Sequence, residues 1–457
     1  MECSDYQSNK DPSDSEGSGG GDASADGSTT PYCYQRAARA LHEADYLLIL
    51  AGAGMSADSG LGTYETMPSR YQEFCDPARL CATTNSERDE FQAFWHSFAL
   101  QYASTKPHEG YAILNNWCHG QKLKRLSSSL SKCNKPTSKQ QESRRSDDTA
   151  DVADGRNFET ANNNALIEDH KWWVYTSNVD GHFRRFPSFQ CHRGIDESID
   201  NTKYNNVCEI HGCAGEFRCS CGMGYFDREG FSRMGDFWAR WNEGVEAIRP
   251  SSLCKVRTET IEELAKRHLQ QSAKSSNNTI NGSSSSSSTA ETNRNKNRLP
   301  PCNDCESLPL RPNVLLFNDT DENVLAPIQG HRNRYQEWEA NVESSVCDPN
   351  TTNGNGINFV LVELGCGINV PAVRNESEEV LADTLDGLLY SSEPTSSSNS
   401  EINSEKSKGS VTLIRINPKD AGVDDQRLLP HVVSIYETSL RALENIDKAL
   451  DSIILEH

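Results

Sequence analysis

The sequence predicts an α/β fold built on a parallel β-sheet that helices cover on both faces. Three observations predict it. Short apolar runs lack polar–apolar alternation, which is typical of strands buried on both faces. Helical stretches lie between these runs. Glycine-rich or polar segments follow the runs directly, as at the carboxyl ends of strands in open α/β sheets.

The apolar runs give the expected strands, because they are short, rich in leucine, β-branched and aromatic residues, and bounded by turn residues. The expected strands are residues 46–50, 173–176, 314–317, 359–364, 411–416 and 432–436. The expected helices include residues 35–43 and 89–102. A last helix is predicted because Leu440, Leu443, Ile446, Leu450 and Ile453 fall on one helical face.

Four of these strands run directly into loops that suit a ligand. LLILAGAGMSADSGLGTY (47–64) passes from a strand into a glycine-rich turn. Glycine has no Cβ and tolerates positive φ, so we expect amide groups there to face a ligand, and the N-terminus of a following helix favours phosphate. The other three loops read SNVDGH (177–182), GCGINVP (365–371) and NP (417–418). Together the four loops favour a nucleotide site over ordinary turns.

The composition separates a folded body from polar segments. Only 35% of the 457 residues are hydrophobic. Residues 1–32 are expected to be a disordered tail, and residues 122–165, 268–299 and 375–410 polar insertions, because such segments bury too little apolar surface to fold. What remains is roughly 300 residues, the size of one α/β domain with a small appendage. We expect a catalytic domain at 33–455 that includes a small module at about 213–310.

Charge and cysteine content limit the classes of function. A net charge of −21 argues against a body that binds nucleic acid directly. The basic stretch 122–145 leaves open a nuclear-import signal, an anionic-partner patch or a solvated loop. Neither a membrane span nor a secretory signal is expected. Sixteen cysteines then predict a reducing compartment, cytoplasmic or nuclear, with free thiols or a metal site.

Six sequence blocks occur in order over about residues 36–450. They read AGAGMSADSGLGTY, TSNVDGHF, EIHGCAGEFRCSCG, PCNDC with RPNVLLFND, VELGCGINVPA and IRINP. These blocks resemble the motifs of the sirtuin family, and most closely its divergent bacterial-type branch. That family consists of NAD-dependent protein lysine deacylases, some of which are ADP-ribosyltransferases. The resemblance implies a Rossmann-like parallel sheet with a smaller zinc-binding module.

The resemblance also implies site residues. The implied NAD contacts are Gly52, Ala53, Gly54, Ser56, Gly60, Tyr64, Ser177, Asn178, Asp180, Gly365, Gly367 and Asn417. The implied catalytic residues are His211, Asn178 and Asp180. His211 is expected to deprotonate a ribose hydroxyl, since the ordinary pKa of histidine, about 6.5, suits a base at neutral pH. A histidine in a surface turn is the alternative, and His108 and His182 are expected to be structural. The implied partner is an acyl-lysine protein or peptide that adds as a strand near residues 316–319 and 370–371.

Cysteine spacing bears on the implied zinc. Cys302-x-x-Cys305 has the spacing of a zinc knuckle, and the family's structural zinc uses two such pairs. The implied ligands are Cys219, Cys221, Cys302 and Cys305. Cys219-Ser220-Cys221 is one residue shorter than the usual pair, so Cys213 or Cys208 stays open as a substitute. Free cysteines packed in a small module are the alternative to zinc.

The chain departs from the family pattern at several positions. Gly62-Thr63-Tyr64-Glu65 stands where most sirtuins have Pro-Asp-Phe-Arg, so Tyr64 can supply the aromatic group but the arginine is missing. Ser177 replaces a glutamine, Gly367 a serine and Asn318 a glycine. The expected function is an NAD-dependent protein lysine deacylase that releases nicotinamide and O-acyl-ADP-ribose. An ADP-ribosyltransferase or NAD hydrolase, and a weakly catalytic NAD or ADP-ribose sensor, remain alternatives.

Overall fold

A computed structural model describes most of the expected folded body. The described residues are 31–63, 66, 74–75, 85–119, 122–123, 126, 170–186, 189, 206–219, 259–260, 310–317, 319, 321–348, 356–391 and 409–456. The predictions for the tail before residue 31, for the insertion at 268–299 and for nearly all of 122–165 lie outside these residues. So do Tyr64, Asn318, Cys221, Cys302 and Cys305.

The main sheet has six parallel strands, which confirms the predicted fold class. The strands are β1 (Tyr46–Ala51), β2 (Trp172–Thr176), β3 (Val207–Glu209), β7 (Asn358–Leu364), β8 (Ser410–Ile416) and β9 (Val432–Ile435), in the order β3-β2-β1-β7-β8-β9. The chain builds outward from β1 to β3, then returns to the other side of β1 with β7. The strand order therefore reverses between β1 and β7, the point at which open α/β sheets bind ligands.

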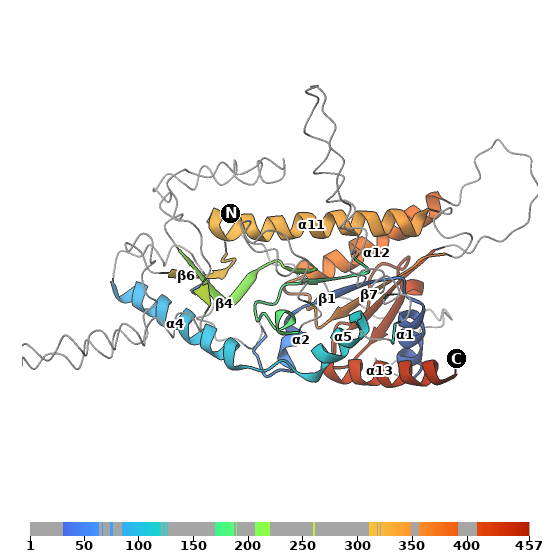
Figure 1. The fold of residues 1–457 in the computed structure, drawn as a ribbon, viewed down its shortest axis with the longest axis horizontal. Helices are drawn as coiled ribbons and strands as arrows, with labels where there is room; N and C mark the ends of the chain where they lie inside the picture. Colours follow the sequence, from blue (N-terminus) through green and yellow to red (C-terminus); the bar gives the residue numbers. More distant parts are fainter. Residues whose placement is uncertain are drawn as a thin grey trace, which may run out of the picture.

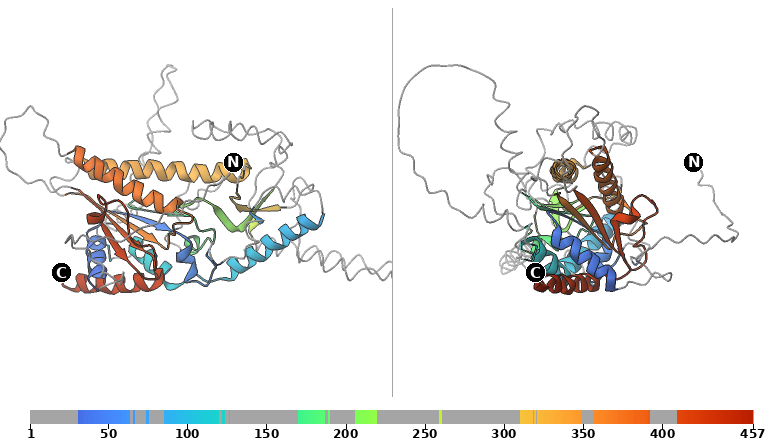
Figure 2. Two further views of the ribbon diagram at one scale, coloured as in Figure 1. Left: turned by 180° about the vertical axis from the view of Figure 1, so that it is seen from behind. Right: turned by 90° about the vertical axis from the view of Figure 1, so that its right-hand side faces the viewer.

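Helices cover both faces of this sheet (Figure 1). One layer contains α1 (Pro31–Glu43), α5 (Glu109–His119) and α13 (Ser439–Glu456), and the other contains α11 (Glu322–Cys347) and α12 (Ala372–Tyr390). Figure 2 shows the two layers on opposite sides of the strands. Successive residues of β1 alternate between them, Leu47 and Ile49 toward the first layer and Leu48 and Leu50 toward the second. Both faces are buried, which explains why the strand sequence shows no polar alternation.

A small antiparallel sheet adjoins the main one. It has the order β5-β4-β6, with β4 at Gly212–Cys219, β5 at Glu259–Thr260 and β6 at Leu310–Val314. The long helix α4 (Asn85–Ser104) packs on it through an aromatic cluster that includes Trp95. Only two residues separate β3 of the main sheet from β4, so the chain passes from one sheet into the other almost without a loop.

The structure corrects two expectations about secondary structure. The run 314–317 is not a strand of the parallel sheet: β6 ends at Val314 and belongs to the small antiparallel sheet. The expected insertion at 375–410 was also wrong over its first part, because α12 continues to Tyr390. Buried Val380 and Leu381 anchor that helix to the core, although acidic neighbours dominate its composition. No helix in the described ranges is long and apolar enough to cross a membrane.

Candidate active site

The carboxyl ends of four strands place the predicted loops at one edge. Ala51 at the end of β1 is in register with Thr176 of β2 and with Leu364 of β7, and Leu364 is in register with Ile416 of β8. The loops that follow these positions therefore lie side by side. They carry all of the predicted NAD contacts that are described, namely Gly52, Ala53, Gly54, Ser56, Gly60, Ser177, Asn178, Asp180, Gly365, Gly367 and Asn417.

The glycine turn after β1 packs directly on the turn after β7. The amide of Gly52 donates to the carbonyl of Leu364 and that of Gly54 to the carbonyl of Gly365, both at 2.9 Å. A Cβ on Gly54 would lie 2.6 Å from Cα of Gly365, whose φ is +62°. Glycine is thus required here by contact between two backbones. The expectation that these two amides face a ligand is corrected, because both are used within the protein.

Two of the predicted NAD contacts hydrogen-bond to each other. Ser56, in the five-residue helix α2 (Ala53–Ala57), donates from Oγ to Oδ2 of Asp180 at 2.5 Å. The phenol of Tyr111 donates to the same oxygen at 3.3 Å, and the amide of His182 donates to Oδ1 at 2.8 Å. The carboxylate of Asp180 therefore ties α2, α5 and the loop after β2 together.

Asn178 has a similar internal contact. Its Nδ2 donates to the carbonyl of Gly52 at 2.9 Å, and its backbone N–H donates to the Thr176 hydroxyl at 3.1 Å. The Thr176 hydroxyl in turn donates to the carbonyl of Ala51 at 2.8 Å. The loop after β2 thus holds the start of the glycine turn in place.

His211 lies where the main sheet gives way to the small one. It follows β3 and precedes β4, and its carbonyl accepts the amide of Leu315 at 2.9 Å. Its Nδ1 lies 3.2 Å from the carbonyl of Ser177. Because a carbonyl can only accept, Nδ1 carries the proton in the neutral ring and Nε2 keeps its lone pair. Burial lowers the pKa of His211, so the ring is neutral at pH 7 and able to accept a proton.

The imidazole of His108 hydrogen-bonds within the protein, and that of His182 is buried. The amide of Gly110 donates to Nδ1 of His108 at 3.0 Å, so Nε2 is the protonated nitrogen that donates to the carbonyl of Met55 at 2.9 Å. His182 is fully buried beside Asp180, and burial lowers the pKa of both histidines.

Sequence reasoning missed Asp58, which lies just after α2. Its Oδ2 accepts the amide of Leu440 at 2.7 Å and so caps the first turn of α13. The two residues are far apart in sequence, and no local motif announces such a cap.

On the β8 side, Asn417 joins two loops. Its Nδ2 donates to the carbonyl of Cys366 at 2.8 Å, and its Oδ1 accepts the amides of Lys419 and Asp420, both at 2.9 Å. A Cβ added to Gly367 would meet no atom within 4 Å, so this glycine borders open space. Gly60 borders open space as well, with φ +85°.

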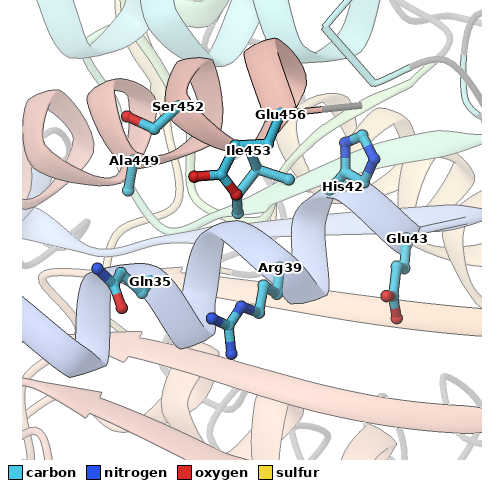
Figure 3. A pocket seen from close by; sticks show the side chains of 8 residues that line it. All are labelled: Gln35, Arg39, His42, Glu43, Ala449, Ser452, Ile453 and Glu456. Carbon is cyan, nitrogen blue, oxygen red and sulfur yellow. The ribbon is translucent and has the colours of Figure 1, made fainter.

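A cavity of about 270 Å³ lies elsewhere, between α1 and α13 (Figure 3). Its lining residues are Gln35, Arg39, His42, Glu43, Ala449, Ser452, Ile453 and Glu456. α1 ends at Glu43, just before β1 begins, so the cavity lies at the amino ends of the strands. It is therefore at the opposite end of the sheet from the loops described above.

Two cysteines named as possible substitute ligands, Cys208 and Cys213, lie in the described ranges. Cys208 and Cys213 are buried free thiols; burial raises the pKa of Cys208 to about 12 and that of Cys213 further. Among the residues that the structure describes, no three His, Cys, Asp or Glu side chains gather to hold a metal ion. The predicted ligand set lies outside these residues apart from the backbone of Cys219, so the zinc site and its possible substitutes Cys208 and Cys213 stay predictions.

The structure is an open parallel sheet with helices on both faces, and its loops converge where the strand order reverses. This arrangement is typical of the class of nucleotide-binding α/β proteins. No protein-family model matches the chain. An NAD-dependent protein deacetylase from Oceanobacillus iheyensis is 32% identical over 79 residues, which are 17% of this chain and 34% of that protein. The match confirms the resemblance to the sirtuin family, and it spans about a third of the relative's length.

Solved structures of Sir2 proteins are similar at a lower level. A mutant Sir2 homologue in complex with ADP-ribose is 13% identical and has a TM-score of 0.41, covering 92% of this chain and 98% of that one. A Sir2 complex with a p53 peptide and NAD+ is 14% identical with a TM-score of 0.41, covering 91% and 97%.

Proposed function

We propose that this protein is an NAD-dependent protein lysine deacylase that releases nicotinamide and O-acyl-ADP-ribose. The observation that carries the proposal is the state of His211. Its ring is neutral, its Nδ1 is held by the carbonyl of Ser177, and its Nε2 is left as a base at the edge where the strand order reverses. The sequence relationship to an NAD-dependent protein deacetylase supports the same reaction.

The edge has features that fit NAD. The glycines at positions 60 and 367 border open space on the two sides of the switch point, where a ligand can approach the backbone. NAD supplies the ADP-ribosyl group, and its bond to nicotinamide breaks in the reaction. In this proposal the loops after β1 and β2 take the diphosphate and the nicotinamide half, and Asn417 and Gly367 take the adenosine half.

The residues proposed as catalytic act in two ways. His211 accepts a proton from a ribose hydroxyl at Nε2, and the Ser177 carbonyl steadies the resulting positive charge through Nδ1. The side chains of Asn178 and Asp180 are engaged with Gly52 and Ser56, so we assign them to holding the site in shape rather than to direct proton transfer.

The acyl-lysine peptide has a candidate position at the same edge. Phe317 after β6 and Ile368 and Val370 after β7 are exposed apolar side chains, 54%, 60% and 42% accessible. Exposed apolar groups after strands of both sheets suit an extended peptide that lies between the two sheets.

A structural zinc is part of the proposal, with Cys219, Cys221, Cys302 and Cys305 as ligands. β4 and β6 are antiparallel, and Cys219 pairs in register with Leu310. The end of β4, two residues before Cys221, therefore lies beside the start of β6, five residues after Cys305. Elemental analysis is expected to find about one zinc per chain, as one four-ligand site requires. The zinc proposal is contradicted if the purified protein contains no zinc and the Cys302→Ala variant is as stable as the unsubstituted protein.

The deciding experiment measures nicotinamide release with and without an acyl-lysine peptide. A deacylase releases nicotinamide in a peptide-dependent way and yields O-acyl-ADP-ribose, whereas an NAD hydrolase releases it without peptide and a transferase leaves ADP-ribose on protein. His211→Ala is expected to lower peptide-dependent release by roughly 10²–10⁴-fold, the usual contribution of a positioned base. NAD binding, measured by calorimetry, is expected to persist.

His331→Ala is the matched control. His331 lies on α11, and its Nδ1 is 3.3 Å from the carbonyl of Val207 at the opposite end of β3. Burial lowers the pKa of this histidine as well, to about 4. Its replacement is expected to leave the rate of folded protein unchanged. Equal rates for His211→Ala and the unsubstituted protein mean that the chemistry occurs elsewhere, or that the protein is a sensor that binds NAD without consuming it.

A further inference from the structure

A buried ion network lies beneath the loop that follows β8. Arg415 of β8 donates from Nε and Nη2 to Oε2 of Glu363 on β7, at 3.0 and 2.8 Å. Ser377 of α12 donates to the same carboxylate and accepts Nη2 of Arg415 at 3.1 Å. The side chains of Arg415 and Glu363 are completely buried. Nη1 of Arg415 also pairs with the carboxylate of Glu378 on α12, at 2.6 Å. The network therefore fixes β7, β8 and α12 in one arrangement.

Two arginines extend this network into the backbone of the loop. Arg374 of α12 donates from Nη1 to the carbonyl of Asp420 and from Nη2 to the carbonyl of Gly422, both at 2.6 Å. Arg415 adds a bond from Nη1 to the carbonyl of Gly422 at 3.0 Å. A planar guanidinium spans two carbonyls with one side chain, and charge-assisted bonds are the stronger kind. The arginines therefore clamp the course of residues 417–423.

The clamped loop is part of the candidate active site. Its first residue, Asn417, donates to the carbonyl of Cys366 in the turn after β7. The preceding glycine of that turn, Gly365, packs on Gly54 of the glycine turn. The loop, the turn after β7 and the glycine turn thus form one continuous wall at the carboxyl edge. A shift in the loop changes the shape of that wall on the β8 side.

We propose that Arg374 and Arg415 are positioning residues that hold the loop after β8 in the shape that receives the adenosine half of NAD. The inference rests on the proposed function. Without these bonds the loop adopts several conformations, only one of which binds the adenosine half. The apparent affinity for NAD is then the intrinsic affinity multiplied by the fraction of molecules in that conformation. A competent fraction between about 1% and 10% corresponds to a loss of roughly 10–100-fold.

The test replaces Arg374 with methionine, which keeps an unbranched apolar stem and removes the guanidinium donors. The Kd of ADP-ribose and the KM for NAD are expected to rise by about 10–100-fold, with kcat nearly unchanged. A purely structural role gives the reverse pattern, since a smaller folded fraction lowers kcat and leaves KM alone. Arg374→Lys is expected to recover part of the affinity, because an ammonium reaches one carbonyl.

Arg427→Met is the matched control. Arg427 follows the same loop, but its side chain is 68% exposed and pairs with the carboxylates of Asp425 and Asp386. Its replacement is expected to leave both constants unchanged.

The outcomes separate this inference from the proposed function. If the unsubstituted protein binds ADP-ribose and Arg374→Met binds it equally well, the inference is overturned and the proposed function stands. If the unsubstituted protein binds neither NAD nor ADP-ribose, the proposed function fails, and the inference with it. If Arg374→Met does not fold, Arg374→Gln, which retains a donor for one carbonyl, is judged by the same criterion.

Discussion

Replacing Gly54 with alanine tests whether the glycine turn is shaped by protein contact or by ligand approach. The added Cβ would lie 2.6 Å from Cα of Gly365 and 2.9 Å from its carbonyl oxygen. Ordinary contacts between carbon atoms are about 3.5–4.0 Å, so the shortfall is about 1 Å. Both atoms belong to backbone, and no side chain can swing aside.

The magnitude follows from this overlap. Overpacking costs up to about 3 kcal/mol when the neighbours cannot move. Alanine is favoured over glycine inside a helix by about 1 kcal/mol, and position 54 lies in α2. The net loss of stability is therefore about 2 kcal/mol. For a body of this size, 1 kcal/mol lowers the Tm by roughly 2–4 °C, so we expect a fall of about 4–8 °C.

The assay is thermal unfolding without ligand, with Gly367→Ala as the matched control. A Cβ on Gly367 meets nothing within 4 Å, so that variant is expected to unfold at the temperature of the parent protein. Its effect on NAD affinity then reports on ligand approach alone. A Gly54→Ala protein that unfolds at the parent temperature would show that the two turns separate without cost, and the reasoning from contact would be refuted.

Three further predictions concern charge and capping. Burial and neighbouring carboxylates raise the pKa of Glu339 to about 8, so the folded state holds a proton that the unfolded chain has released, and stability falls as the pH rises from about 4.5 to 8. Glu339→Gln should therefore raise the Tm at pH 8.5 and leave it unchanged at pH 4.5. An equal rise in Tm at both pH values contradicts this. Asp58→Ala removes the cap from the amide of Leu440 and should cost about 1 kcal/mol in denaturant unfolding, with Asp58→Asn retaining part of it; equal loss in both variants would exclude a capping role. Because burial lowers the pKa of His211, the acid limb of kcat/KM should lie below pH 6.5, and an acid limb above pH 6.5 contradicts the assignment. The same histidine makes stability fall as the pH drops below 6.5, since the unfolded chain takes up the proton first.

The sequence was sufficient for the main sheet because its strands are buried on both faces. Five of the six apolar runs correspond to β1, β2, β7, β8 and β9, within one or two residues at each end. β3 was missed because it has only three residues, too few for a pattern. The run at 314–317 has the composition of a buried strand, but β6 and its continuation bury Val314 and Leu316 against α4 instead of in the main sheet.

Amino-acid composition failed to predict two helices in which only a few residues are buried. In α12, polar and acidic residues surround a narrow apolar stripe, so the overall composition suggested an insertion although Val373 and Val380 are buried. α11 is similar, with Tyr335 and Trp338 buried on one side of a polar helix.

The candidate site could be located from sequence, but its internal contacts could not. Glycine and polar motifs indicated which loops converge. That Gly54 meets Gly365, or that Ser56 bonds to Asp180, depends on packing between segments more than 100 residues apart in sequence. Such pairs leave no local signal in a single sequence.

The position of His211 between the two sheets has a mechanical consequence. Its backbone is bonded to the small sheet through Leu315, whereas its imidazole is bonded to the main sheet through Ser177. A rotation of one sheet against the other therefore changes the distance between Nδ1 and the carbonyl of Ser177, because the two ends of this contact belong to different sheets. The hydrogen bond that keeps the proton on Nδ1 of His211 thus depends on the angle between the two sheets. In the proposed reaction, a change in that angle is therefore expected to act on proton transfer at Nε2 of His211.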